Sequence, residues 1–152
     1  MTALSSSTAG NWKDQLLGYQ FPPGALHVLP YEDWLARDCI GALPAQGKAL
    51  HPAWTLIGAL RGMGLTLSEL FAVIGAADDD GVMFGETEID QYEPLEVERH
   101  YAISGRFVDV QRRRGRKLGT FDLVTFELTI EHHDGPVARC RNSFVVPRRD
   151  KS

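Results

Sequence analysis

The segment Pro52–Gly64 constrains the fold of this chain more than any other part of the sequence. Its larger apolar residues recur at helical spacing and Arg61 is its only charge, so the predicted helix is apolar on nearly every side. Pro52 suits the first helical position, where an N–H would have no partner within the helix. Such a helix is normally buried on most sides, and its several glycines and alanines indicate that another element packs closely against it.

The second half of the chain is predicted to form the sheet that covers this helix. After Gly81 the apolar residues change from a helical period to a period of two. Gly115 and the pair Asp134-Gly135 are typical of hairpin turns, so the strands are expected to be antiparallel. The predicted strands are 82–90, 98–112, 119–132 and 136–147.

The first half is predicted to hold short helices and one poorly formed strand. Asn11 is an expected N-cap, Pro30 suits a helix start, and Thr66 with Glu69 matches a capping box. Residues 18–28 include Pro22-Pro23-Gly24, which predicts a turn or a broken edge strand. The helices that these signals predict are 11–17, 31–40 and 66–74. The pattern alone predicts an α+β protein with an antiparallel sheet. The helix that is apolar nearly all round favours the hot-dog arrangement, in which a strongly curved sheet wraps around such a central helix.

Length and composition exclude several classes of protein. The 152 residues fit one domain, which we place at 11–147 between a disordered lead-in at 1–10 and a charged tail at 148–152. The net charge of -4 argues against nucleic-acid binding through the overall field of the protein. No apolar run reaches the roughly 18 residues of a membrane span, and no signal peptide is expected. We therefore expect a cytoplasmic protein with Cys39 and Cys140 reduced.

Four segments of the sequence resemble MaoC-type (R)-specific enoyl-CoA hydratases and 3-hydroxyacyl dehydratases. His51-Pro-Ala-Trp54 stands where that family begins its central helix, and Gly85–Leu95 resembles the glycine-to-Pro-Leu segment that follows. Ile103–Gly119 resembles the strand, basic hairpin and strand that come next, and Ala138–Pro147 resembles the final strand. The likeness covers about 18–147 and is best to the N-terminal half of two-domain MaoC dehydratases, and also to small subunits that pair with a catalytic chain.

The resemblance implies chemistry on an acyl thioester, in which coenzyme A or an acyl carrier is part of the substrate and no separate cofactor is needed. It also implies a homodimer, or a heterodimer with a second MaoC-like chain, because hot-dog chains commonly join their sheets and hold the acyl group at the interface. An acyl-CoA thioesterase and a non-catalytic module that binds acyl-CoA or a partner are the alternatives. The helix carries no acid between Pro52 and Met63, which counts against the thioesterase.

The chain departs from the active members of the family ahead of the central helix. Those members carry a Gly-Asp-x-Asn-Pro-x-His loop, whereas this chain has the shorter segment Arg37–Lys48 in that place. Asp38 and His51 are the acid and imidazole that flank the segment, and hydration of an enoyl thioester needs a base and an acid. They are the catalytic candidates. In the alternative interpretation Asp38 ends a surface helix and His51 is a helix cap or only lines the substrate site.

A basic hairpin and a tryptophan are the candidates for substrate binding. The hairpin could clamp the phosphates of coenzyme A through charge-assisted hydrogen bonds, or it could be a solvated tip that keeps the end of the sheet soluble. An RNA contact is disfavoured because the chain is acidic and the run lacks interleaved aromatics. Trp54, like Trp34, could stack on the adenine or anchor a core or dimer face. The basic residues are Arg112, Arg113, Arg114, Arg116 and Lys117.

Two further polar runs are predicted to be plain loops. Asp78-Asp79-Asp80-Gly81 lacks the additional ligands of a calcium loop at the required spacing. His132-His133-Asp134 lies at a hairpin tip, where a zinc site would need a third ligand. The sequence therefore predicts no metal site.

Overall fold

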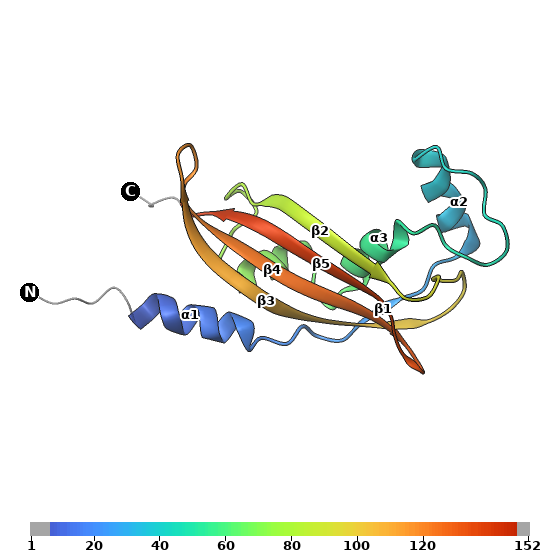
Figure 1. The fold of residues 1–152 in the computed structure, drawn as a ribbon, viewed down its shortest axis with the longest axis horizontal. Helices are drawn as coiled ribbons and strands as arrows, with labels where there is room; N and C mark the ends of the chain where they lie inside the picture. Colours follow the sequence, from blue (N-terminus) through green and yellow to red (C-terminus); the bar gives the residue numbers. More distant parts are fainter. Residues whose placement is uncertain (1–6, 149–152) are drawn as a thin grey trace, which may run out of the picture.

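A computed structural model describes residues 7–148 of the chain as four helices and five strands (Figure 1). The α+β class predicted from the sequence is confirmed. The helices are α1 Ser7–Leu17, α2 Pro30–Cys39, α3 Trp54–Gly62 and α4 Leu67–Val73. The strands are β1 Gly24–Leu26, β2 Met83–Gln91, β3 Tyr101–Gly115, β4 Gly119–His132 and β5 Gly135–Pro147.

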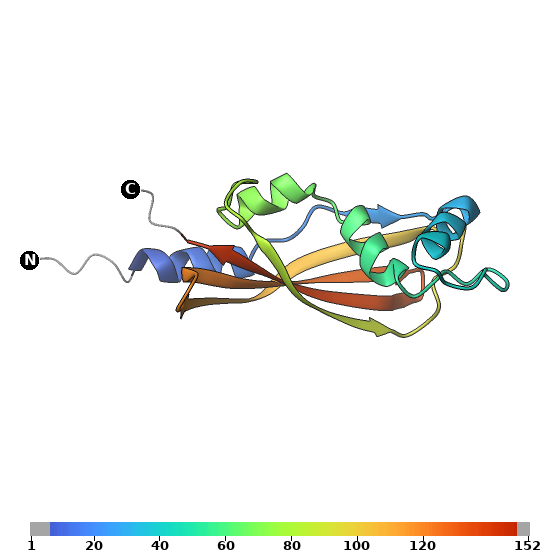
Figure 2. The same cartoon turned by 90° about the horizontal axis from the view of Figure 1, so that it is seen from above.

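The five strands form one curved antiparallel sheet in the order β1-β3-β4-β5-β2. The predicted hairpins are present, with β3 and β4 joined after Gly115 and with His132 paired to Gly135 across the second turn. Helices α3 and α4 lie together on one face of the sheet (Figure 2). The short β1, with a single bridge from Gln20 to Arg106 before it, is the broken edge strand that the prolines predicted.

The central helix α3 is buried or half-buried on most of its surface, as predicted. Thr55 and Ala59 are fully buried against the sheet, and only Ile57 and Arg61 are exposed among its residues. Ile57, which is 43% exposed, marks the strip of the helix that this chain leaves open. The helix begins at Trp54 rather than Pro52, because residues 52 and 53 form the preceding turn.

The predicted close neighbour of α3 is the edge strand β1. A Cβ on Gly62 would overlap the carbonyl oxygen of Ala25, and a Cβ on Gly24 would overlap the carbonyl oxygen of Gly62. Gly64 approaches Pro22 in the same way. The small residues therefore let the end of α3 and the strand touch backbone to backbone.

Two predictions for the chain ends need correction. Helix α1 begins at Ser7, so residues 7–10 are helical rather than part of a disordered lead-in, and Asn11 lies inside the helix and does not cap it. Arg148, assigned to the charged tail, is part of the fold: its guanidinium donates to Asp122 at 2.7 Å and to the carbonyl oxygen of Ile74 at 2.6 Å. The rest of the predicted lead-in and tail lies outside the described residues.

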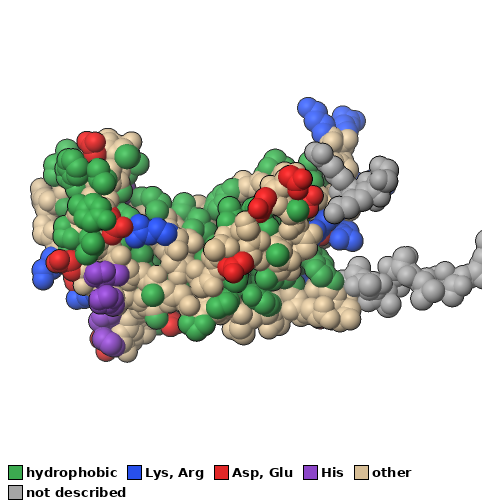
Figure 3. Space-filling model, turned by 180° about the vertical axis from the view of Figure 1, so that it is seen from behind, with side chains coloured by type: hydrophobic (Ala, Val, Ile, Leu, Met, Phe, Trp, Pro, Cys, Tyr) green, Lys and Arg blue, Asp and Glu red, His purple; other side chains and the backbone are tan. Residues whose placement is uncertain are grey.

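Helix α2 turns its polar side towards the protein and its apolar side outwards. Asp33 is buried and Arg37 is largely covered, whereas Tyr31 and Trp34 are about 60% exposed and Leu35 is 47% exposed. The helix projects beyond the end of the sheet near α3 (Figure 1), and apolar side chains gather on this projection (Figure 3). An apolar surface of this kind is typical of a site that contacts another molecule.

Within the described residues, no single helix is long and apolar enough to cross a membrane. Helices α3 and α4 reach that length and hydropathy only when taken together, and they are bent by 72° relative to each other.

Candidate functional site

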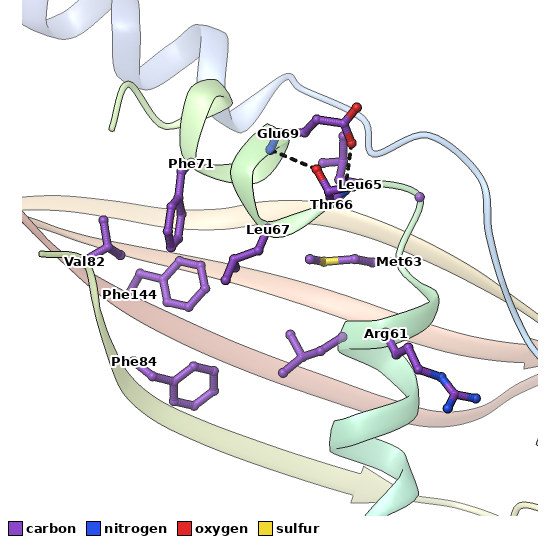
Figure 4. Close-up of a pocket in the computed structure, with 12 residues that line it drawn as sticks. Arg61, Met63, Leu65, Thr66, Leu67, Glu69, Phe71, Val82, Phe84 and Phe144 are labelled. Carbon is purple, nitrogen blue, oxygen red and sulfur yellow. Dashed lines mark hydrogen bonds between the residues drawn. The ribbon is translucent and has the colours of Figure 1, made fainter. Parts of the chain in front are cut away.

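An apolar groove lies between the end of α3, helix α4 and the strands β2 and β5. Its volume is about 770 Å³, within the range of small-molecule sites. Three phenylalanines form its apolar wall, with Phe144 between Phe71 and Phe84 (Figure 4). The Phe144 ring meets each of the other two edge to face at a centroid distance of 5.8 Å. The remaining lining is Leu60, Arg61, Met63, Gly64, Leu65, Thr66, Leu67, Glu69 and Val82.

The charged side chains that line this groove are held by neighbours. Arg61 donates to Glu32 at 3.0 Å, and its guanidinium lies 5.1 Å from the centre of the Trp54 ring. In Figure 4 the guanidinium points away from the phenylalanines, so Arg61 marks the polar rim of the groove. Glu69 accepts a hydrogen bond from the Thr66 N–H at 2.7 Å, which holds the pKa of Glu69 below its usual value. Thr66 and Glu69 form the capping box that the sequence predicted.

No hydrogen bond or ion pair joins the two catalytic candidates, Asp38 and His51, in the described part of the chain. Asp38 lies exposed in the last turn of α2. Nδ1 of His51 accepts a hydrogen bond from the Ala53 N–H at 3.1 Å, which places the proton of a neutral ring on Nε2. Neither Asp38 nor His51 lines the groove. Their role in catalysis stays a prediction.

Asp33 is the buried carboxylate beside His51, and the sequence analysis missed it. Its Oδ1 accepts from the His51 N–H at 3.0 Å and from Nε1 of Trp54 at 2.9 Å, while Oδ2 accepts from Nε of Arg37 at 2.7 Å. Burial acts to raise the pKa of Asp33, but the hydrogen bond from Arg37 and the others outweigh it and lower the pKa. Asp33 therefore stays ionised and holds α2 against the start of α3.

Trp54 is an anchor of the core, one of the two roles left open by the sequence. It is 3% exposed, its indole N–H is taken by Asp33, and its ring is covered by Arg61. A buried indole whose N–H has a partner is a stable arrangement. Trp54 thus has no free face for an adenine in this chain.

The basic hairpin divides into two groups. Arg112 donates twice to the buried Asp122, at 2.8 and 3.0 Å, and Arg113 donates to Gln111 at 2.6 Å. The other three residues are exposed at the tip, and no ion pair joins them to another described residue. None of the five lines the groove. Those three at the tip are Arg114, Arg116 and Lys117. Arg112 and Arg113 are exposed as well, so the predicted phosphate-binding role of all five stays a prediction.

The described residues contain no cluster of three or more potential metal ligands. His132 and His133 lie at the hairpin between β4 and β5, with ring centroids 4.5 Å apart; His133 is exposed and His132 is half-buried. Asp78 accepts a hydrogen bond from Ser68 at 2.9 Å, and Asp80 accepts one from the Ala77 N–H at 2.8 Å. Cys39 is exposed and Cys140 is buried, and both are free thiols.

Comparison with known proteins supports the fold through structure and not through sequence. No family model matches the chain, and no curated protein matches it in sequence. A chain of the ChsH1-ChsH2 complex from Mycobacterium tuberculosis is 16% identical, with a TM-score of 0.73 over 96% of both chains. A MaoC-like dehydratase from Phytophthora capsici is 13% identical, with a TM-score of 0.66 over 91% of this chain and 51% of its own. A hot-dog-like protein from Thermanaerovibrio acidaminovorans is 13% identical, with a TM-score of 0.56 over 88% and 85%.

These likenesses define the class of fold. The chain is a hot-dog protein, and its structural neighbours include MaoC-like dehydratases, as the resemblance in the sequence implied. This chain spans about half the length of the Phytophthora protein.

Proposed function

We propose that this chain is the substrate-binding member of a two-chain hydratase or dehydratase that acts on acyl thioesters. The groove beside α3 holds the acyl group, and a second hot-dog chain supplies the acid and the base. The thioester is carried by coenzyme A or by an acyl carrier protein. The two free thiols fit the reducing compartment expected for such a protein.

The observation that carries the proposal is an acyl-sized apolar groove without an acid–base pair on its wall. An elimination or hydration of this kind needs two groups that exchange protons with the substrate. The ionisable side chains of the lining are Arg61, which is paired with Glu32, and Glu69, which caps α4. The groove can therefore bind an acyl chain, but its own side chains do not supply the proton transfers.

The surface around the groove supports a second chain. Among residues 7–148, strand β2 has only β5 beside it, so its other backbone edge is open in this part of the chain. Open edges of this length are normally covered in native proteins. Phe84 of this strand is 48% exposed and Ile57 of α3 is 43% exposed, which gives the edge an apolar surface. One of the structural neighbours is itself a chain of a complex, and another is a MaoC-like dehydratase.

The thioesterase alternative gains no support from the groove. That reaction would use a carboxylate close to the thioester, and the lining offers Glu69 alone. Its carboxylate is engaged with the first turn of α4, with one oxygen 2.7 Å from the Thr66 nitrogen. A free thiol released from an acyl-CoA by this chain would restore that alternative.

The experiment is a calorimetric titration of the chain with a medium-chain acyl-CoA. Leu67→Asp places a charge in the groove and is expected to weaken binding by at least about tenfold, because the charge would lose water on contact with the acyl chain. The matched control is Leu43→Asp, since Leu43 is 83% exposed and lies outside the groove. Equal effects of the two changes, or no binding by the native chain, would refute the groove assignment.

A second measurement tests the division of labour. The chain alone is expected to leave a trans-2-enoyl-CoA unchanged, as followed by the absorbance of the conjugated thioester. Turnover by the isolated chain would show that it carries its own acid and base, and the two-chain part of the proposal would then be wrong while the substrate class would stand.

A further inference from the structure

Strand β2 has two chemically different faces along its open edge. Phe84 and Ile89 lie on the side of the helices, opposite the buried residues Phe144 and Cys140 of β5. The face away from the helices carries only acidic side chains at the alternating positions in the middle of the strand. These are Glu86, Glu88 and Asp90, which pair in register with Ser143, Arg141 and Arg139.

The arginines of β5 neutralise this acidic row only in part. Arg139 donates to Asp90 at 2.8 Å, whereas Arg141 reaches Glu88 at 3.9 Å and is closer to Glu127, at 2.9 Å. Glu86 stands opposite Ser143 and has no ion pair with a described residue. The open edge of the sheet therefore carries a net negative charge on this face.

The geometry of strand pairing determines what happens when two copies of β2 meet. In an antiparallel pair, directly opposite residues lie on the same face of the sheet. A two-fold axis that keeps the helices of both copies on one face must therefore place even-numbered residues of this stretch opposite even-numbered ones. When the axis passes Thr87, Glu86 of each copy faces Glu88 of the other. When the axis passes Glu88, Glu86 faces Asp90 of the other copy and the two Glu88 residues face each other. Like charges directly opposite each other destabilise a strand pair.

We propose that β2 pairs with the edge strand of a different hot-dog chain, one that carries Lys or Arg on the face away from its helices. The inference rests on the proposed function, which calls for a second chain, and it names the chemistry of that chain. The apolar face of the partner's edge strand covers Phe84 and Ile89, as any copy of the fold would. The basic row of the same strand meets Glu86 and Glu88. Self-pairing is disfavoured by the same charges, so the row selects the partner.

The chain itself provides the test, through a charge-inverted copy. Glu86→Lys/Glu88→Lys gives an edge that is basic where the native edge is acidic. Sedimentation equilibrium is expected to show weak self-association for the native chain. The equimolar mixture is expected to form a 1:1 complex at least about tenfold tighter than the native self-pair, because with the axis at Thr87 both Glu86–Glu88 pairs become Glu–Lys pairs. Added salt is expected to weaken the mixed complex.

The matched control inverts two exposed acids away from the edge. Asp14→Lys/Asp79→Lys changes the net charge by the same amount, and its mixture with the native chain should show no gain. Glu86→Lys alone is the second variant if the double change impairs folding, since its neighbour on β5 is Ser143 rather than an arginine.

Three results would overturn the inference: a tight native self-dimer that does not respond to salt, no gain on mixing, or an equal gain with the control. The acyl-CoA titration of the groove is independent of these results. A gain on mixing without acyl-CoA binding would leave the partner inference standing and remove the proposed substrate.

Discussion

Asp33 links α2 to the start of α3 through three hydrogen bonds to one buried carboxylate. It is 2% exposed and accepts from Arg37, His51 and Trp54. Asp33→Ala is expected to lower the free energy of unfolding by about 3 kcal/mol, because it leaves a largely covered guanidinium and two donors without their acceptor. Urea denaturation followed by circular dichroism measures this cost.

The control for this change is Asp38→Ala, on the same helix. Asp38 is exposed, and changes at such positions are usually within about 0.5 kcal/mol. A cost for Asp38 similar to that for Asp33 would contradict the interpretation that only the buried carboxylate holds α2 in place.

The buried carboxylates also set the response of stability to acid. Burial raises the pKa values of Asp33, Asp122 and Glu127, but hydrogen bonds from arginines outweigh it, so each pKa is lower than usual. The unfolded chain therefore takes up protons first as the pH falls below about 4.5. The stability from these groups is complete above that range and is lost as the pH falls towards their folded pKa values. Urea denaturation at pH 7 and at pH 3.5 should show this loss, and Asp122→Asn should make it smaller.

Residue types near the predicted site were visible in the sequence, but their partners were not. Asp38 was the candidate acid because it stands beside the loop, whereas Asp33 stands five residues earlier within the helix. In a helix with four charged residues among ten, the sequence does not show which acid is buried. Only the fold shows that Arg37 and Trp54 meet at Asp33.

At the scale of the elements, the contact between α3 and β1 provides a sharp test. In an exposed helix, Gly→Ala stabilises by up to about 1 kcal/mol. Gly62→Ala should instead cost at least about 2 kcal/mol, because its Cβ would overlap the Ala25 carbonyl oxygen and the Ile103 side chain. Thermal unfolding measures the difference. Gly18→Ala is the control, since its Cβ would meet its nearest neighbour at an ordinary 3.4 Å; a harmless Gly62→Ala would mean that helix and strand do not touch there.

Element types were predictable because the apolar period is strong in long segments. All four predicted long strands occur in the structure. The three helices predicted besides the central one also occur, and the ends of these elements differ from the prediction by a few residues. The helix ends were less certain because they depend on tertiary contacts. Pro52 suits a helix start by its own geometry, yet the hydrogen bond from the His51 N–H to Asp33 fixes a turn there and delays α3 until Trp54.

At the scale of the whole molecule, the sequence could predict a sheet against an apolar helix but not how much of that helix stays open. The prediction took the pattern of Pro52–Gly64 as evidence that the chain encloses it. The structure leaves Ile57 open beside β2. An apolar pattern states only that a surface will be covered, and it does not say whether the cover belongs to the same chain.

The outward apolar side of α2 has a spectroscopic consequence. The chain has three tryptophans, and Trp34 is the one that stands 61% exposed on this helix, while Trp54 is 3% exposed. Indole fluorescence moves to shorter wavelengths when water leaves the ring, so a companion protein that sits on α2 should shift the emission of Trp34. Trp34→Phe should abolish the shift while leaving the complex measurable by sedimentation. Emission that does not change on binding would mean that the companion lies along β2 alone and leaves α2 in solvent.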